Sequence, residues 1–147
     1  MDRRKFIQHS CICGLTGICA VEMLSGCTAV KYSSGTIRGS DLFVPIEAFI
    51  DKNGDSIQYR KYLITGNEIL KFPICVFRFS DSDYQALWTE CTHQGSELQV
   101  FGEKLVCPAH GSEFDARGHV SEGPADKNLR SFSVKIDGDY LKISLKK

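Results

Sequence analysis

Two short segments that each hold one cysteine and one histidine constrain this chain more than any other feature. The first contains Cys91 and His93, and the second contains Cys107 and His110. Two thiols and two imidazoles at such spacings are a typical metal-ligand set. We therefore expect the chain to fold around a metal centre that brings the two segments together.

The order of the four residues narrows the kind of centre. A zinc finger usually groups its cysteines in one half of the motif and its histidines in the other, whereas each half here has one of each. This alternation suits a two-iron cluster in which both cysteines bind one iron and both histidines bind the other. A structural zinc module that uses the same four residues is the alternative.

With the glycine and proline residues around it, the pattern resembles the Rieske [2Fe–2S] family. The resemblance implies an all-β fold, an antiparallel β sandwich or barrel with an inserted two-loop subdomain that binds one [2Fe–2S] cluster. It implies that Cys91 and Cys107 bind one iron, while His93 and His110 bind the other. It also implies a surrounding set of residues close to the cluster: Gly95, Gly111, Ser112 and Pro124.

The chain departs from the high-potential Rieske proteins of respiratory quinol oxidase complexes. Those proteins join their two loops by a disulfide, but the corresponding residues here are Ser96 and Ala109. They also place a tyrosine near the cluster where this chain has Phe114, although Ser112 matches their serine. Because fewer hydrogen bonds would reach the reduced cluster, we expect a reduction potential below that of the respiratory proteins.

The remainder of the domain reads as short strands separated by turns. We expect strands at residues 42–49, 57–64 and 72–79, then a hairpin at 113–120 and a closing hairpin at 129–145. Cys75 lies within the most apolar of these strands, so we expect a buried core residue rather than a ligand. His119 is expected to be a surface residue, because the set of four ligands is complete without it.

The first 27 residues read as an export signal. Arg3, Arg4 and Lys5 precede an apolar stretch that is shorter than the about 20 residues needed to span a bilayer. This arrangement is typical of a bacterial signal peptide and resembles the twin-arginine type. Residues 24–27, Leu-Ser-Gly-Cys, resemble a lipobox, which predicts acylation of Cys27. The alternative is a plain signal peptide in which the cysteine occurs by chance.

These features predict three regions. Residues 1–26 form the signal peptide, residues 27–40 a lipid anchor and tether, and residues 41–147 the Rieske domain. Four of the seven cysteines lie in the first 27 residues, so the domain itself is not a disulfide scaffold. The predicted location is the exported, periplasmic side of the cell envelope, with the domain anchored to a membrane.

The predicted function is one-electron transfer between a redox protein donor and a redox protein acceptor, without a small-molecule substrate. The chain would be an electron-transfer component, such as the small subunit of a membrane-associated or periplasmic oxidoreductase, rather than a stand-alone catalyst. The formal net charge is zero, so no basic face points to nucleic acid. An oxygenase component would need a second iron site with two histidines and a carboxylate, but only His119 follows His110.

Overall fold

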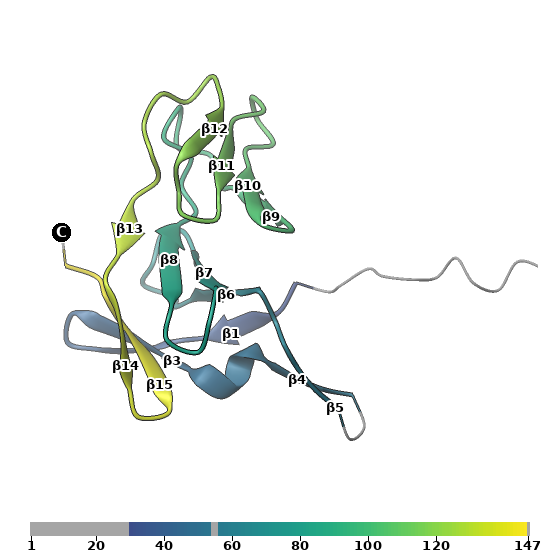
Figure 1. Ribbon diagram of the computed structural model, residues 1–147. Coiled ribbons are helices and arrows are strands. Elements are labelled where there is room, and N and C mark those ends of the chain that lie inside the picture. The colour runs from purple at the N-terminus through teal and green to yellow at the C-terminus, as the bar shows by residue number, and fades with distance from the viewer. Residues whose placement is uncertain (1–29, 54–55, 147) are drawn as a thin grey trace, which may run out of the picture.

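Strands make up almost all of the regular structure. The computed structural model describes residues 30–53 and 56–146, and there it has fifteen strands and one short 3₁₀ helix (Figure 1). The expected all-β class is confirmed. Within the described residues, no helix is long and apolar enough to cross a bilayer. In chain order, the elements are β1 (Tyr32–Ser34), β2 (Thr36–Arg38), β3 (Asp41–Pro45), η1 (Ile46–Phe49), β4 (Ile50–Asn53), β5 (Ser56–Tyr59), β6 (Tyr62–Gly66), β7 (Ile74–Arg78), β8 (Tyr84–Trp88), β9 (Gln99–Phe101), β10 (Lys104–Val106), β11 (Glu113–Asp115), β12 (Val120–Glu122), β13 (Ser131–Phe132), β14 (Val134–Asp137) and β15 (Tyr140–Ser144).

A five-stranded sheet in the order β1-β6-β7-β8-β13 forms the middle layer. Its central strand, β7, is antiparallel to both β6 and β8. Successive side chains of a strand point to opposite faces, so Cys75 and Phe77 pack into one core and Ile74 and Val76 into the other. The continuous apolar run of this strand is therefore explained by burial on both faces.

Each face of the middle sheet shares a core with a different four-stranded sheet. The sheet β14-β15-β3-β2 shares the core that contains Leu42 and Leu141. The sheet β12-β11-β10-β9, at the top of Figure 1, carries the core that contains Phe114 together with Cys91 and Cys107. The two candidate cysteine ligands thus lie inside a packed core of their own, separated from the other core by one sheet.

The N-terminal part of the domain differs from the sequence-based expectation. Residues 32–34 and 36–38 were expected to belong to a tether, but they form β1, which runs parallel to β6, and β2, which pairs with β3. Gly35 between them is buried, and a Cβ at this position would lie 2.5 Å from Cδ1 of Leu42. Close packing, not flexibility, accounts for this glycine, and the predicted signal peptide and Cys27 lie outside the described residues.

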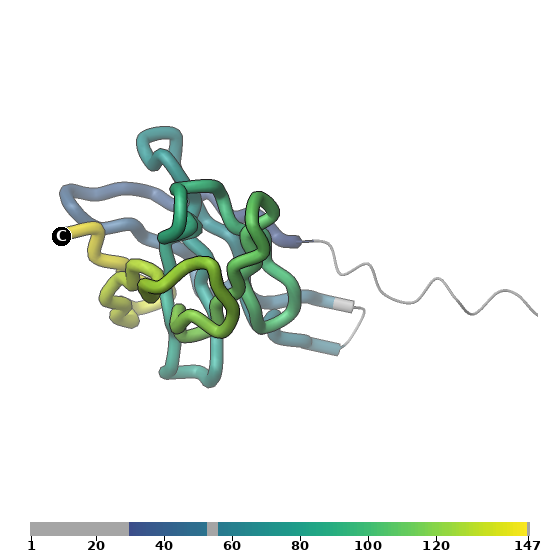
Figure 2. The backbone as a smooth tube through the Cα atoms, turned by 90° about the horizontal axis from the view of Figure 1, so that it is seen from above, coloured from purple at the N-terminus to yellow at the C-terminus, as the bar shows by residue number. Residues whose placement is uncertain are grey.

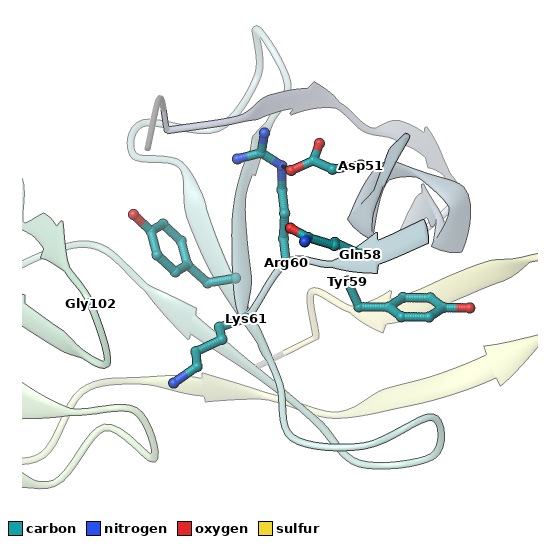
Figure 3. A pocket seen from close by; sticks show the side chains of 7 residues that line it. Asp51, Gln58, Tyr59, Arg60, Lys61 and Gly102 are labelled. Carbon is teal, nitrogen blue, oxygen red and sulfur yellow. Dashed lines mark ion pairs between the residues drawn. The ribbon is translucent and has the colours of Figure 1, made fainter. Parts of the chain in front are cut away.

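The strand predicted at residues 57–64 is divided in two. β5 pairs with β4 in an arm that projects from the body, and β6 joins the middle sheet. A cavity of about 310 Å³ lies at the base of this arm (Figure 3). Its cations are paired, Arg60 with Asp51 at 2.7 Å and Lys61 with Glu103 at 3.1 Å. The Lys61–Glu103 pair connects the arm to the β9–β10 hairpin across the surface.

Candidate functional site

Two loops with the same backbone hydrogen bonds carry the candidate ligands. The first loop (residues 91–96) joins β8 to β9, and the second loop (residues 107–112) joins β10 to β11. In each loop the cysteine N–H donates to the carbonyl oxygen of the serine five positions later: Cys91 to Ser96 and Cys107 to Ser112, both at 2.8 Å. The two loops therefore have the same backbone structure, although the histidine follows the cysteine by two residues in the first loop and by three in the second.

A glycine in each loop completes this hydrogen-bond pattern. The N–H of Gly95 donates to the carbonyl of Cys91 at 2.8 Å, and that of Gly111 donates to the carbonyl of Cys107 at 2.9 Å. Their φ angles are +72° and +78°, in the left-handed region that glycine adopts without steric cost. The tight turn of each loop therefore depends on a glycine at this position.

The two cysteines lie side by side at the buried end of the loops. Cys91 is 2% exposed and Cys107 is 1% exposed, both thiols are free, and they hydrogen-bond to each other. Burial opposes ionisation of both. At Cys107 the effect of burial is outweighed by N–H donors from His110 and Ala109 and by the Cys91 thiol, so the pKa of Cys107 is lowered. Burial and the neighbouring Cys107 raise the pKa of Cys91.

The two histidines form a second pair at the surface. His93 and His110 are both exposed, and their ring centroids are 5.0 Å apart with the rings nearly perpendicular. Among the residues that the structure describes, no three His, Cys, Asp or Glu side chains form a group that could hold one metal ion. The four candidate ligands therefore meet as a buried sulfur pair and an exposed nitrogen pair.

The proline loop (residues 123–125) is hydrogen-bonded to the second loop, and the chain just after it is bonded to the first. The N–H of Ala125 donates to Oγ of Ser112 at 3.0 Å, and Oγ1 of Thr92 donates to the carbonyl of Lys127 at 2.6 Å. Pro124 follows a cis peptide bond and is exposed. Figure 2 looks down on this end of the molecule, where the three segments lie together.

Two side chains at the site were not predicted to act there. Ser96 hydrogen-bonds to the Cys107 thiol, and Thr92 joins the first loop to Lys127. The signal for Ser96 is present in the sequence, since both loops read Cys-x-x-x-Gly-Ser. Phe114, where the respiratory relatives were expected to carry tyrosine, is fully buried in the same core as both cysteines.

A cavity of about 400 Å³ adjoins the first loop, and its lining includes Trp88, His93 and Arg130. Glu90, in the lining of this cavity, binds two neighbouring side chains. Its carboxylate accepts a hydrogen bond from Nε1 of Trp88 at 2.9 Å and lies 3.6 Å from Nζ of Lys71. The Arg130 guanidinium lies 5.8 Å from the centroid of the Trp88 ring. The surface beside His93 is thus built from side chains that already bind one another.

The residues present fit a two-iron, two-sulfur cluster. Two thiols side by side and two imidazoles side by side provide two ligands for each of two irons. Backbone N–H groups from both loops point at the cysteine sulfurs, where they would stabilise thiolates. The thiols are inside the protein and the imidazoles at its surface, so such a centre could exchange an electron with a partner that touches the histidines.

The other notable histidine and cysteine lie outside this site, as expected. His119 is exposed on the β11–β12 hairpin, where its backbone N–H and ring bond to the Asp115 carboxylate at 2.9 and 3.2 Å. Cys75 is fully buried in β7, and burial raises its pKa far above the usual range of a thiol. Neither residue is placed to bind the same metal as the four candidate ligands.

A family profile matches more than half of the chain. Residues 52–133 match the Rieske [2Fe-2S] domain. Among curated relatives, the chain is 36% identical over 64 residues to the cytochrome b6-f complex iron-sulfur subunit 2 of Nostoc sp. (strain PCC 7120), which covers 42% of this chain and 36% of that protein. It is 43% identical over 56 residues to the cytochrome b6-f complex iron-sulfur subunit of Synechococcus sp. (strain JA-2-3B'a(2-13)), covering 37% and 33%.

The matched segment therefore spans about a third of the length of these curated relatives. Among solved structures, the cyanobacterial plasma membrane Rieske protein PetC3 from Synechocystis PCC 6803 is 31% identical with a TM-score of 0.50. The likeness covers 57% of this chain and 86% of that structure. The sequence and structure comparisons thus agree on one family.

Proposed function

This chain belongs to the Rieske [2Fe–2S] family, and from that premise we propose that it carries single electrons between two redox proteins. A Rieske domain binds one [2Fe–2S] cluster. Cys91 and Cys107 would hold one iron, and His93 and His110 the other. The observation that carries the proposal is the pairing itself: two adjacent buried thiols and two adjacent exposed imidazoles.

When bound, the cluster supplies a one-electron redox centre whose potential lies in the range of about −150 to +300 mV that imidazole ligation permits. The chain contributes the surroundings. The N–H groups of both loops stabilise the thiolates, and Gly95 and Gly111 provide the tight turns. Ser112 and the loop at Pro124 cover the sulfur side, while the exposed histidines present the centre to a partner.

We also propose that the chain is exported and anchored through an acylated Cys27 to the membrane that faces the periplasm. Support comes from the Leu-Ser-Gly-Cys motif at residues 24–27 and the basic, then apolar, leader before it. The donor and the acceptor would be redox proteins of the same compartment. The chain would serve as an electron-transfer component, such as the small subunit of a membrane-associated oxidoreductase, rather than as a catalyst alone.

A structural zinc module is not supported. The family match is to an iron–sulfur domain.

The test is electron paramagnetic resonance of the full chain purified from membranes and reduced with dithionite, with iron, zinc and sulfide measured in the same sample. We expect a rhombic signal, two irons and two sulfides per chain. His93→Ala and His110→Ala should each abolish the signal, and His119→Ala is the matched control that should keep it. A colourless protein with one zinc per chain would contradict the proposal.

A further inference from the structure

We infer that the side of the domain that carries Val30, Tyr32 and Phe101 lies flat against the membrane surface. This inference rests on the anchoring at Cys27 proposed above and adds the orientation of the anchored domain. Its consequence is that the domain is held in one pose beside the bilayer, and does not swing on a tether.

The first observation is an apolar groove between the start of the described chain and the β9 strand. Its volume is about 340 Å³, and its lining includes Val30, Tyr32 and Phe101. These three side chains are 52%, 64% and 61% exposed. Glu97 and Gln99, both exposed, also line the groove. Exposed apolar groups that cluster beside polar ones mark a site of contact with a membrane, a protein or a ligand.

The second observation is the length of chain between this groove and the proposed anchor. Only Thr28 and Ala29 separate Cys27 from Val30. Three residue steps extend over at most about 11 Å, and β1 is already hydrogen-bonded to the body of the protein from Tyr32 onward. An acylated Cys27 would therefore hold Val30, at the edge of the groove, within about 11 Å of the lipid surface.

The third observation is a second apolar patch on the same side. The β4–β5 arm extends toward the side from which the described chain begins, and both views agree on this (Figures 1 and 2). On the arm, Ile57 is 63% exposed, and Tyr59 is 51% exposed with the Arg78 guanidinium 4.2 Å from the centroid of its ring. Aromatic and aliphatic side chains of this kind partition into the membrane–water interface. The arm and the groove therefore offer two separate contacts with one lipid surface.

Three of the lysines near these contacts are bonded to other groups, while Lys52 on the arm is exposed. Lys61 is paired with Glu103 at 3.1 Å and Lys104 with Glu113 at 2.7 Å. Nζ of Lys31 donates to the carbonyl of Ile50 at 3.3 Å. Because these lysines already bind other groups, we expect the contact to form on zwitterionic lipid as well as on anionic lipid.

The orientation has a consequence for the histidines. The two candidate ligand loops lie at the end of the β9–β12 sheet, at the top of Figure 1, whereas the chain begins at the side. With that side on the membrane, His93 and His110 would face along the bilayer plane. A redox partner embedded in or bound to the same membrane could then reach them from the side.

The test uses the full chain, matured and acylated in the cell and reconstituted in phosphatidylcholine vesicles. A bimane fluorophore is attached to Phe101→Cys, Ile57→Cys or Ile136→Cys, and quenching by doxyl-labelled phosphatidylcholine is measured. Ile136 is the matched control, since it is 47% exposed and lies on β14, on the opposite side from the start of the chain in both views. We expect several-fold stronger quenching at positions 101 and 57 than at position 136.

The intact mass of each sample separates the two proposals. If Cys27 carries no acyl chains, the proposed anchor fails and this inference fails with it. If Cys27 is acylated but all three positions are quenched equally, the domain has no fixed pose and the inference alone is overturned. Quenching at position 101 without quenching at 57 also overturns it, because the groove would then hold a single lipid chain or a partner.

Hydrogen exchange of the unlabelled protein provides a second measurement that needs no substitution. Two samples are compared: the acylated protein on vesicles, and the protein without acyl chains in detergent-free buffer. Backbone amides of β9 and β5 should exchange more slowly in the vesicle sample, and those of β14 should exchange equally in both. Equal slowing in all three strands, or none, would overturn the inference.

Discussion

Phe114 is fully buried in the same core as Cys91 and Cys107. Its ring contributes no hydrogen-bond donor to the sulfurs, whereas Ser112, also fully buried, carries a hydroxyl that accepts from Ala125 and retains its own proton for donation. At the residue scale, the reduction potential therefore depends on which core side chains carry a donor.

Phe114→Tyr is expected to raise the reduction potential, because a hydroxyl near the cysteine sulfurs would stabilise the more negative, reduced state. The measurement is a potentiometric titration followed by electron paramagnetic resonance. Phe114→Leu is the control for altered packing and should change the potential less. Equal potentials for the tyrosine variant and the parent protein would contradict the argument.

Cys75 provides a test of the distinction between a core thiol and a ligand. It pairs across the sheet with Ile64 and Leu87, which are apolar and buried. Cys75→Ser should unfold more easily than Cys75→Ala by about 1–3 kcal/mol, because it buries a hydroxyl among apolar side chains. Urea unfolding measures the difference. Both variants should keep the iron content of the parent, and loss of iron from the alanine variant would mean that Cys75 serves the cluster.

Among the elements, the β11–β12 hairpin links the site to the middle sheet. Gly118 in its turn has a φ of +88°, and a Cβ there would lie 2.7 Å from Cδ2 of Leu87. At Gly138, in the β14–β15 turn, φ is +58° and a Cβ would meet nothing within 4 Å. The two turns share a backbone conformation but differ in the space around them.

Gly118→Ala is therefore expected to cost more stability than Gly138→Ala. The left-handed conformation alone costs about 1–2 kcal/mol for a residue with a Cβ, and the contact with Leu87 should add at least another ~1 kcal/mol at position 118. Thermal or urea unfolding of the two variants gives the comparison. Similar losses would show that Leu87 moves aside freely.

An ion pair joins the same hairpin to the β7–β8 turn. The Arg117 guanidinium donates to both carboxylate oxygens of Asp83, at 3.1 and 2.6 Å, and lies 3.8 Å from the centroid of the Phe79 ring. The hydrogen bonds from Arg117 lower the pKa of Asp83. Since the pKa in the folded state is lowered, the stabilisation is complete above the value of the unfolded chain and is lost only as the pH falls through the folded value.

Asp83→Asn should therefore reduce the urea midpoint by the same small amount at about pH 6 and about pH 8, because both lie above the range in which Asp83 titrates. Exposed ion pairs contribute little, so we expect a small shift. Asp126→Asn, on an exposed residue of the same charge, is the control. If the shift in urea midpoint caused by Asp83→Asn differed between about pH 6 and about pH 8, Asp83 would have to titrate within that pH range, which would contradict the lowered pKa.

The sequence predicted the elements near the site better than those at the N-terminus. The two loops, the apolar strand β7 and the closing hairpin β14–β15 carry local signals: the metal-ligand spacing, a continuous apolar run and an Asp-Gly-Asp turn. β1 carries none, because it has only three residues, Tyr-Ser-Ser, and forms by pairing in parallel with β6. The role of Gly35 could not be predicted, because it depends on a contact with Leu42 that only the fold creates.

Within the site, the four candidate ligands could be predicted from their spacing, but their surroundings could be predicted only in part. Ser96 was considered solely as the position of a missing disulfide, although its side chain bonds to Cys107. Thr92 gave no signal, because its partner is a backbone carbonyl at Lys127, far along the chain. Contacts of this kind depend on how segments meet, and one sequence does not record them.

At the scale of the whole molecule, two separate cores lie on either side of the middle sheet. The core with Cys91 and Cys107 lies toward the β9–β12 sheet, and the other core, with Leu42 and Leu141, contains no candidate ligand. β7 contributes alternate residues to both. Binding of the cluster should therefore stabilise one half of the protein more than the other.

Removal of iron by a chelator under reducing conditions is expected to speed hydrogen exchange in β9 to β12 while β3 and β15 stay protected. The proposed ligands close the two loops over one core only, so metal binding is linked to the folding of that half. Mass-spectrometric exchange on the iron-loaded and iron-free protein tests this. A uniform rise in exchange over all four sheets would mean that the two cores unfold as one unit.

The early start of β1 has a kinetic consequence. With the proposed anchor at Cys27 and strand pairing from Tyr32 onward, the domain would stay close to the membrane, so a partner that is not a subunit of the same complex would have to diffuse up to it. Turnover should then be bimolecular. Its rate would rise in proportion to the surface density of the partner in the membrane and fall as the lipid becomes more viscous.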